Sequence, residues 1–72
     1  MSDTLAQLDV VALLTDLPDH GLVRGQVGTI VETLPSDTFA VEFSDDEGHT
    51  YALLPLHREQ LMRLYHQPVQ AA

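Results

Sequence analysis

Hydrophobic and polar residues alternate most regularly in one segment near the middle of the chain. Phe39, Val41 and Phe43 occupy every second position and are separated by Ala40 and Glu42. Successive side chains of a β-strand point to opposite faces, so a period of two predicts a strand with one buried face. We therefore expect the two phenylalanines and Val41 to point into a core.

Shorter apolar runs on both sides of this segment are rich in β-branched residues and are bounded by turn formers. Pro35-Ser36-Asp37 precedes the central segment, and Ser44 to Gly48 follows it as a predicted hairpin turn in which Gly48 takes positive φ. Gly28 lies inside the second run and predicts a bulge or a close backbone approach. The four predicted strands are Leu8–Leu14, Gln26–Leu34, Thr38–Phe43 and His49–Leu54, the last ended by Pro55.

The segment His57 to Tyr65 has two interpretations. Leu61, Leu64 and Tyr65 share one face of a helix, and their neighbours are good helix formers. Alternatively, His57 to Gln60 forms one 3₁₀ turn that leads into a last strand at Leu61 to Leu64. We favour the second interpretation because a barrel needs a strand that covers its edge.

This order of elements predicts an all-β fold, a small SH3-like barrel of about five strands with a 3₁₀ turn before the last strand. The barrel is expected over residues 8–65, between flexible ends at residues 1–7 and 66–72. The expected core contains, besides the three residues of the central strand, the following side chains: Val27 or Ile30, Tyr51 and Leu53.

A chain of 72 residues forms one domain, and a domain of this size has a thin margin of stability. It has no cysteine, so neither a disulfide nor a thiolate metal site contributes. Hydrophobic residues make up 44% of the chain. So large an apolar fraction on so small a body indicates that some of these side chains stay exposed in the monomer, where another protein or a second copy can cover them.

The chain is acidic, with three Lys+Arg against 11 Asp+Glu and a formal net charge of -8. Three arginines cannot neutralise a row of phosphates, so nucleic-acid binding is not expected, and an anionic membrane surface would repel the chain. No apolar run is long enough for a membrane span, and the first residues lack the basic and apolar regions of a signal peptide. We expect a cytoplasmic protein of bacterial type, whose acidity serves solubility or attracts a basic partner.

No pattern of catalytic or metal-binding residues is found. The four histidines, His20, His49, His57 and His66, do not have the spacing of a zinc site. The acidic residues 45–47 are adjacent, unlike the alternate ligands of a calcium loop, and nothing places a nucleophile beside the Asp16–Asp19–His20 group. The chain has no Trp for an aromatic peptide groove. We expect no catalytic residue, no metal and no cofactor, and a protein that is not an enzyme.

The loop from Asp16 to Gly25 is the expected working surface. It contains the apolar residues Leu17, Leu22 and Val23 among turn formers. Either these side chains cover one end of the barrel, or they form an exposed apolar contact beside Arg24. The hypothesis for partner binding names Leu22, Val23 and Arg24 as the contact and Asp45 and Asp46 as charges that steer a basic partner.

Two long stretches of the chain, LDVVALLTDLPDHGLVRGQVGTIVE and VEFSDDEGHTYALLPLHREQL, resemble a family of short bacterial proteins, domain-of-unknown-function family 4926. The resemblance is carried best by residues 25–29 (GQVGT), 41–43 (VEF) and 51–54 (YALL). It implies an SH3-like fold, brings no catalytic residue, and places members in toxin–antitoxin-like gene settings. The expected function is a small acidic protein-binding module, as in the neutralising member of such a pair. The alternative is an accessory subunit of an enzyme complex, as SH3-like barrels are in nitrile hydratase assemblies.

Overall fold

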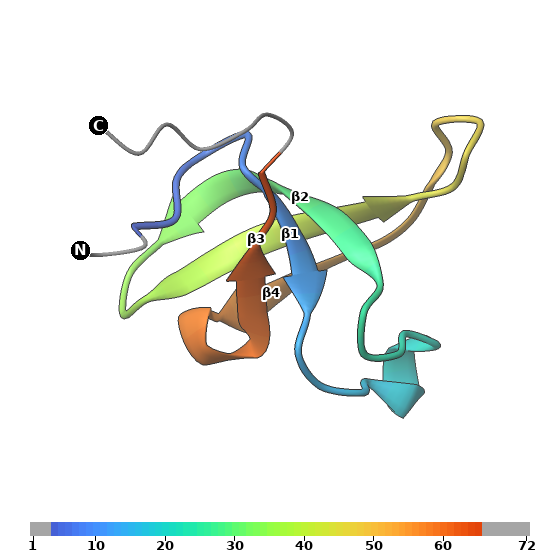
Figure 1. Ribbon diagram of the computed structural model, residues 1–72, viewed down its shortest axis with the longest axis horizontal. Helices are drawn as coiled ribbons and strands as arrows, with labels where there is room; N and C mark the ends of the chain where they lie inside the picture. Colours follow the sequence, from blue (N-terminus) through green and yellow to red (C-terminus); the bar gives the residue numbers. More distant parts are fainter. Residues whose placement is uncertain (1–3, 66–72) are drawn as a thin grey trace.

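The computed structural model describes residues 4–65, and in this part of the chain it contains five strands and two short 3₁₀ turns (Figure 1). The predicted all-β class is confirmed, as is the 3₁₀ turn before the last strand. Within residues 4–65 no helix has the length and apolar character needed to cross a membrane. The elements are β1 (Val10–Leu13), η1 (Pro18–His20), β2 (Val27–Leu34), β3 (Thr38–Ser44), β4 (Thr50–His57), η2 (Arg58–Gln60) and β5 (Leu61–Arg63).

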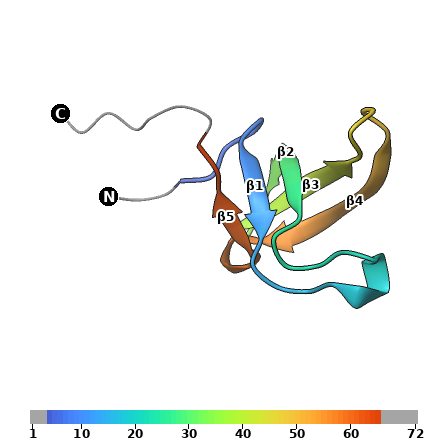
Figure 2. The same ribbon diagram turned by 45° about the vertical axis from the view of Figure 1, so that its right-hand side comes forward.

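The five strands form one antiparallel sheet in the order β4-β3-β2-β1-β5 (Figure 2). The expected closed barrel is not formed, because β4 and β5 do not pair and each is an edge of the sheet. The sheet nevertheless curves strongly, since one core cluster takes buried side chains from all five strands. The interpretation of residues 57–65 as a 3₁₀ turn and a strand is confirmed, with β5 paired to β1.

The inward face of β3 carries the centre of the core, as the alternation predicts. Phe39, Val41 and Phe43 are all buried, and the last two have no exposed surface. Of the two β2 residues left open by the sequence, Ile30 is fully buried, whereas Val27 is 49% exposed. Ile30 lies opposite Val41 in the ladder between β2 and β3, so the two side chains share the inner face.

On β4 the predicted inward residues are wrong. Leu54 is 8% exposed and Leu56 is also buried, whereas Tyr51 and Leu53, which were expected in the core, lie on the surface. The inner face of β4 follows from its pairing of Leu54 with Val41. Because neighbouring residues of a strand face opposite sides, this register excludes Leu53 from the core. The ladder shifts by one residue beside Phe43, so Tyr51 is passed over in the pairing.

Pro55 was expected to end the fourth strand, and this prediction is also wrong. The residue pairs with Ala40 of β3, and β4 continues to His57. Proline lacks a backbone N–H and is tolerated in a sheet where that group would face solvent. β4 is an edge strand, so one side of it has no partner strand and accommodates Pro55 there.

Two further segments differ from their predicted roles. Leu5 was assigned to a flexible end, yet its side chain is buried in the core cluster. The first strand is shorter than expected, beginning at Val10 and ending at Leu13, so that Leu14 lies at its end and is partly exposed. The other residues assigned to flexible ends, 1–3 and 66–72, lie outside the described part of the chain.

The turns follow the backbone chemistry of their residues. Ser36 and Asp37 both have positive φ, which gives a tight turn between β2 and β3 whose twist matches that of the strands. Gly48 has φ of 85°, as predicted for the hairpin between β3 and β4. Gly28 makes the close approach expected from its position, whereas the irregularity of β2 lies further on, between Ile30 and Glu32.

Candidate functional site

Leu17 and Leu22 close the tip of the loop between β1 and β2, on either side of η1. Their backbones form a two-residue bridge, in which Leu17 N–H donates to the Leu22 carbonyl at 2.9 Å and Leu22 N–H donates to the Leu17 carbonyl at 3.1 Å. Leu22 is only 1% exposed and belongs to the core cluster, with Leu17 packed against it. Leu22 therefore covers one end of the core, which is the first of the two alternatives. Its side chain is not exposed for the expected contact with a partner.

The two residues that follow remain on the surface. Val23 is 59% exposed, and Arg24 is exposed as well. Hydrogen bonds hold this part of the loop: Arg24 N–H donates to Asp16 Oδ1 at 2.8 Å, and Val23 N–H donates to Gln26 Oε1 at 3.0 Å. The Gln26 amide also lies 2.6 Å from the Tyr51 hydroxyl, which ties the loop to β4. Val23 and Arg24 thus remain candidates for partner contact.

The hairpin between β3 and β4 carries the acidic residues, and it lies apart from the β1–β2 loop in both views (Figures 1 and 2). Asp45 and Asp46 are exposed, as expected. Asp45 Oδ1 accepts the backbone N–H groups of Glu47 and His49, each at 2.9 Å. The N–H of His49, and to a smaller extent that of Glu47, lowers the pKa of the Asp45 carboxyl because each favours its ionised form.

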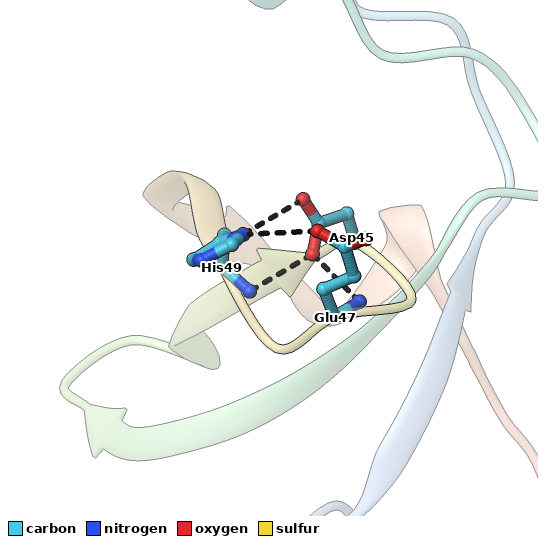
Figure 3. Close-up of side chains that lie close together, drawn as sticks. All are labelled: Asp45, Glu47 and His49. Atoms are coloured by element: carbon cyan, nitrogen blue, oxygen red, sulfur yellow. Dashed lines mark hydrogen bonds and ion pairs between the residues drawn. The ribbon is translucent and has the colours of Figure 1, made fainter.

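Three side chains of this hairpin converge on one point (Figure 3). Asp45 Oδ2 and Glu47 Oε1 lie 3.4 and 3.7 Å from His49 Nδ1, and one ligand atom from each residue falls within 4.8 Å of the others. Two carboxylates and an imidazole are ligands that divalent cations accept. All three residues are exposed, and Asp45 Oδ1 already accepts two backbone N–H groups of the turn. The hydrogen bonding of the hairpin therefore explains why these side chains lie close together.

The other histidines do not join this group. His20 lies exposed in η1, and His57 Nδ1 is 3.4 Å from Thr38 Oγ1 while its backbone N–H donates to Gln60 Oε1 at 2.9 Å. His57 therefore helps to begin η2, which turns the chain into β5. His66 lies outside the described residues.

A pocket of about 190 Å³ lies along β5, at the edge of the sheet opposite β4. Leu61 and Met62 of β5 contribute to it, and Leu5 and Leu14 add apolar surface from the start of the chain and the end of β1. Two arginine side chains lie in the same wall. We call it the β5-edge pocket, and its lining residues are Leu5, Leu14, Arg58, Leu61, Met62, Arg63 and Tyr65.

The cationic part of this pocket is held in place by its neighbours. The Arg63 guanidinium lies 3.6 Å from a carboxylate oxygen of Asp9 and stacks over the Tyr65 ring, 4.9 Å from its centroid. A guanidinium has five N–H donors, so one carboxylate at this distance leaves part of its capacity unused. Arg58, at the start of η2, lines the same pocket.

Sequence reasoning missed this pocket. Its polar residues come from the segment that has two interpretations, and Leu5 and Leu14 come from positions more than 40 residues away along the chain, as the numbering shows. One signal was present: two arginines, a methionine and a tyrosine fall within residues 58–65, and these are the residue types enriched at protein interfaces. Without the pairing of β1 with β5, nothing gathered them with the apolar residues.

The comparison with protein families matches residues 7–63 to a family described as Domain of unknown function (DUF4926). The chain belongs to this family. The match covers every strand, from β1 to the end of β5, and therefore includes most of the β5-edge pocket. No curated protein and no solved structure gives a significant match to the chain.

Proposed function

We propose that this member of the DUF4926 family is a protein-binding module and that the β5-edge pocket is the centre of its contact surface. One observation carries the proposal. Among the described residues, eight large hydrophobic side chains are exposed, and three of them, Leu14, Met62 and Tyr65, line this pocket. Two of the chain's three arginines line it as well.

The chemistry of this surface suits a contact with another protein. Tyrosine, methionine and arginine contribute large contact areas, and binding energy concentrates where such side chains become fully desolvated. Leu14, Met62 and Tyr65 are 43%, 49% and 55% exposed, so each keeps surface that a partner can bury. The neighbouring strand β5 is an edge of the sheet, where a partner can also form backbone hydrogen bonds.

The acidity of the chain has a separate role in this proposal. With a net charge of -8, the chain attracts a basic partner over long distances and raises the rate of encounter, while the apolar contacts set the lifetime of the complex. Val23 and Arg24 of the β1–β2 loop and the acidic hairpin belong to the periphery of this arrangement. A small basic partner would assign the chain to a toxin–antitoxin-like pair, and a large enzyme would assign it as an accessory subunit.

The test begins with the full chain as bait in extracts of its source organism. A captured protein is purified, and its affinity for the chain is measured by surface plasmon resonance. The decisive variant is Met62→Ser with Tyr65→Ala, which removes two exposed side chains of the pocket. We expect the affinity to fall by about 2 kcal/mol or more, roughly thirtyfold, mainly through faster dissociation.

The matched control is Val23→Ser with Arg24→Ala, which removes an exposed apolar side chain and an arginine from the β1–β2 loop. It should change the affinity by less than threefold, while melting curves of both double variants stay close to that of the parent chain. If the loop variant loses binding and the pocket variant keeps it, the surface proposed from the sequence is the correct one and the β5-edge pocket is not.

A further inference from the structure

The β5-edge pocket combines apolar walls with two guanidinium groups, and this combination points to the chemistry of its occupant. Leu14 and Met62, with the largely buried Leu61, form the apolar part of the lining, whereas Arg58 and Arg63 supply two guanidinium groups, whose N–H donors are of the kind that binds an anion. A guanidinium recognises a carboxylate, as it does a phosphate, with paired, charge-assisted hydrogen bonds. The pocket is therefore suited to a group that is apolar on one side and carries a carboxylate on the other.

The size of the pocket limits that group. A volume of about 190 Å³ is below the roughly 300–1,000 Å³ of pockets that enclose drug-sized ligands or cofactors. The pocket therefore suits a group of about the size of one amino-acid residue and is too small for a nucleotide. An apolar residue at the carboxyl end of a chain has its side chain and its carboxylate on the same carbon atom, so both fit into one small site.

The edge of β5 offers backbone groups to the residues before such a chain end. Leu14 N–H donates to the Gln60 carbonyl and Leu64 N–H donates to the Val10 carbonyl, each at 2.8 Å. In an antiparallel ladder, alternate residues of a strand turn their backbone groups to the same side, so residues 60, 62 and 64 face β1. The backbone groups of Arg63 therefore point to the outer edge of the sheet, beside the pocket.

We propose that the β5-edge pocket binds the carboxy-terminal residue of a partner protein, an apolar residue whose carboxylate lies between Arg58 and Arg63, with the preceding residues paired to the edge of β5. This inference rests on the proposed function and names the part of the partner that is recognised. The net charge of -8 opposes an anion at long range, so the partner is basic elsewhere on its surface and the terminal carboxylate is recognised only at short range. The two requirements are compatible in one small basic protein.

The test uses the full ¹⁵N-labelled chain and an N-acetylated tripeptide, threonyl-valyl-leucine, with a free carboxylate. Its matched control is the same tripeptide with an amide end, which keeps the shape and removes the charge. We expect the acid to shift the amide signals of Leu14 and of residues 61–65 at millimolar concentration, and the amide form to bind about tenfold more weakly, because charge-assisted hydrogen bonds are lost. Hexanoate, which has the charge and an apolar chain but no peptide backbone, should bind more weakly than the tripeptide acid.

Variants show whether the arginines of the pocket read the charge. Arg58→Gln and Arg63→Gln should each reduce the preference for acid over amide, whereas Arg24→Gln makes the same change of net charge in the β1–β2 loop and should leave it unchanged. Equal binding of acid and amide to the parent chain, shifts confined to other surfaces, or absence of binding at millimolar concentration would overturn the inference without any variant. If hexanoate bound as tightly as the tripeptide, the pocket would recognise a free aliphatic acid rather than the end of a protein chain, and the inference would also be overturned.

The outcome is separable from that of the proposed function. If a captured partner depends on Met62 and Tyr65 but the tripeptide acid has no advantage over its amide, the protein-binding surface is correct and the chain-end recognition is wrong. If the tripeptide acid binds at the pocket but the affinity of the captured partner does not depend on Met62 and Tyr65, the carboxylate site is correct and the proposed interface is wrong.

Discussion

Gly28 of β2 lies against the ring of Phe43 of β3 so closely that a Cβ atom at Gly28 would be 2.8 Å from Phe43 Cε1. The same Cβ would meet Val41 Cγ1 at 2.8 Å and the Glu42 carbonyl oxygen at 2.9 Å. Phe43 and Val41 have no exposed surface, so making room for this Cβ requires a shift of packed core atoms. Gly28→Ala should therefore destabilise the fold by about 1–3 kcal/mol, as other insertions into packed cores do, measured by urea unfolding.

A double-mutant cycle separates this clash from a general effect on the strand. Phe43→Leu removes ring atoms beside Gly28, so the double variant should be less destabilised than the sum of the two single variants by about 0.5 kcal/mol or more. Strict additivity would mean that the Phe43 ring is not what excludes a side chain from position 28.

The register of β4 makes neighbouring leucines unequal. Leu54 is buried opposite Val41, and Leu53 is 60% exposed on the other face. We expect Leu54→Ala to cost about 2–5 kcal/mol and Leu53→Ala less than about 1 kcal/mol, because only the first leaves a cavity. Thermal melts of the two variants measure the contrast. If Leu53→Ala were the more destabilising variant, Tyr51 and Leu53 would form the inward face of β4 instead of Leu54.

The β1–β2 loop contains a second pair of neighbours with different roles. Leu22 is buried in the core cluster, whereas Val23 is largely exposed. Leu22→Ala should destabilise the chain by about 2–5 kcal/mol, close to the whole margin of so small a domain, while Val23→Ala should stay within about 0.5 kcal/mol. Circular dichroism melts decide the matter. A stable Leu22→Ala variant would mean that this loop does not cover the core.

The Asp45 carboxyl gives the hairpin a pH dependence of known sign. Its pKa is lowered in the folded chain, chiefly by the backbone N–H of His49 and then by that of Glu47. A lowered pKa means that the folded state favours the ionised carboxylate, so its stabilisation is present above the ordinary value of 3.8 and is lost as the pH falls through the folded pKa. Asp45→Ala should thus melt below the parent at pH 7, and the difference should shrink below pH 3.8.

Asp45→Asn is the matched variant for this residue, because its amide oxygen still accepts the two backbone N–H groups without carrying a charge. Its melting temperature should lie between those of the parent and Asp45→Ala at pH 7. A difference between the parent and Asp45→Ala that grows on acidification would contradict the assigned sign.

Local chemistry was enough to predict much of the fold. The alternation of Phe39, Val41 and Phe43 identified the inward face of β3, and Gly48 marked the hairpin, because both depend on residues adjacent in sequence. The faces of β4 could not be predicted in this way. Its run of apolar residues, with Leu53 beside Leu54, is compatible with either face inward, and the pairing with β3 decides between them.

The candidate site, like the fold, was predicted only in part from the sequence. The sequence by itself determined that the chain is acidic, all-β and rich in apolar residues for its size, because composition and period are properties of the chain alone. It also identified a loop with apolar residues, but only the tertiary structure showed that Leu22 is used for the core and that Val23 is not. The β5-edge pocket was decided entirely by the tertiary structure. It exists because β5 pairs with β1, which brings Leu14 to two arginines that follow more than 40 residues later, and because Leu5 joins the core cluster that contains Leu61.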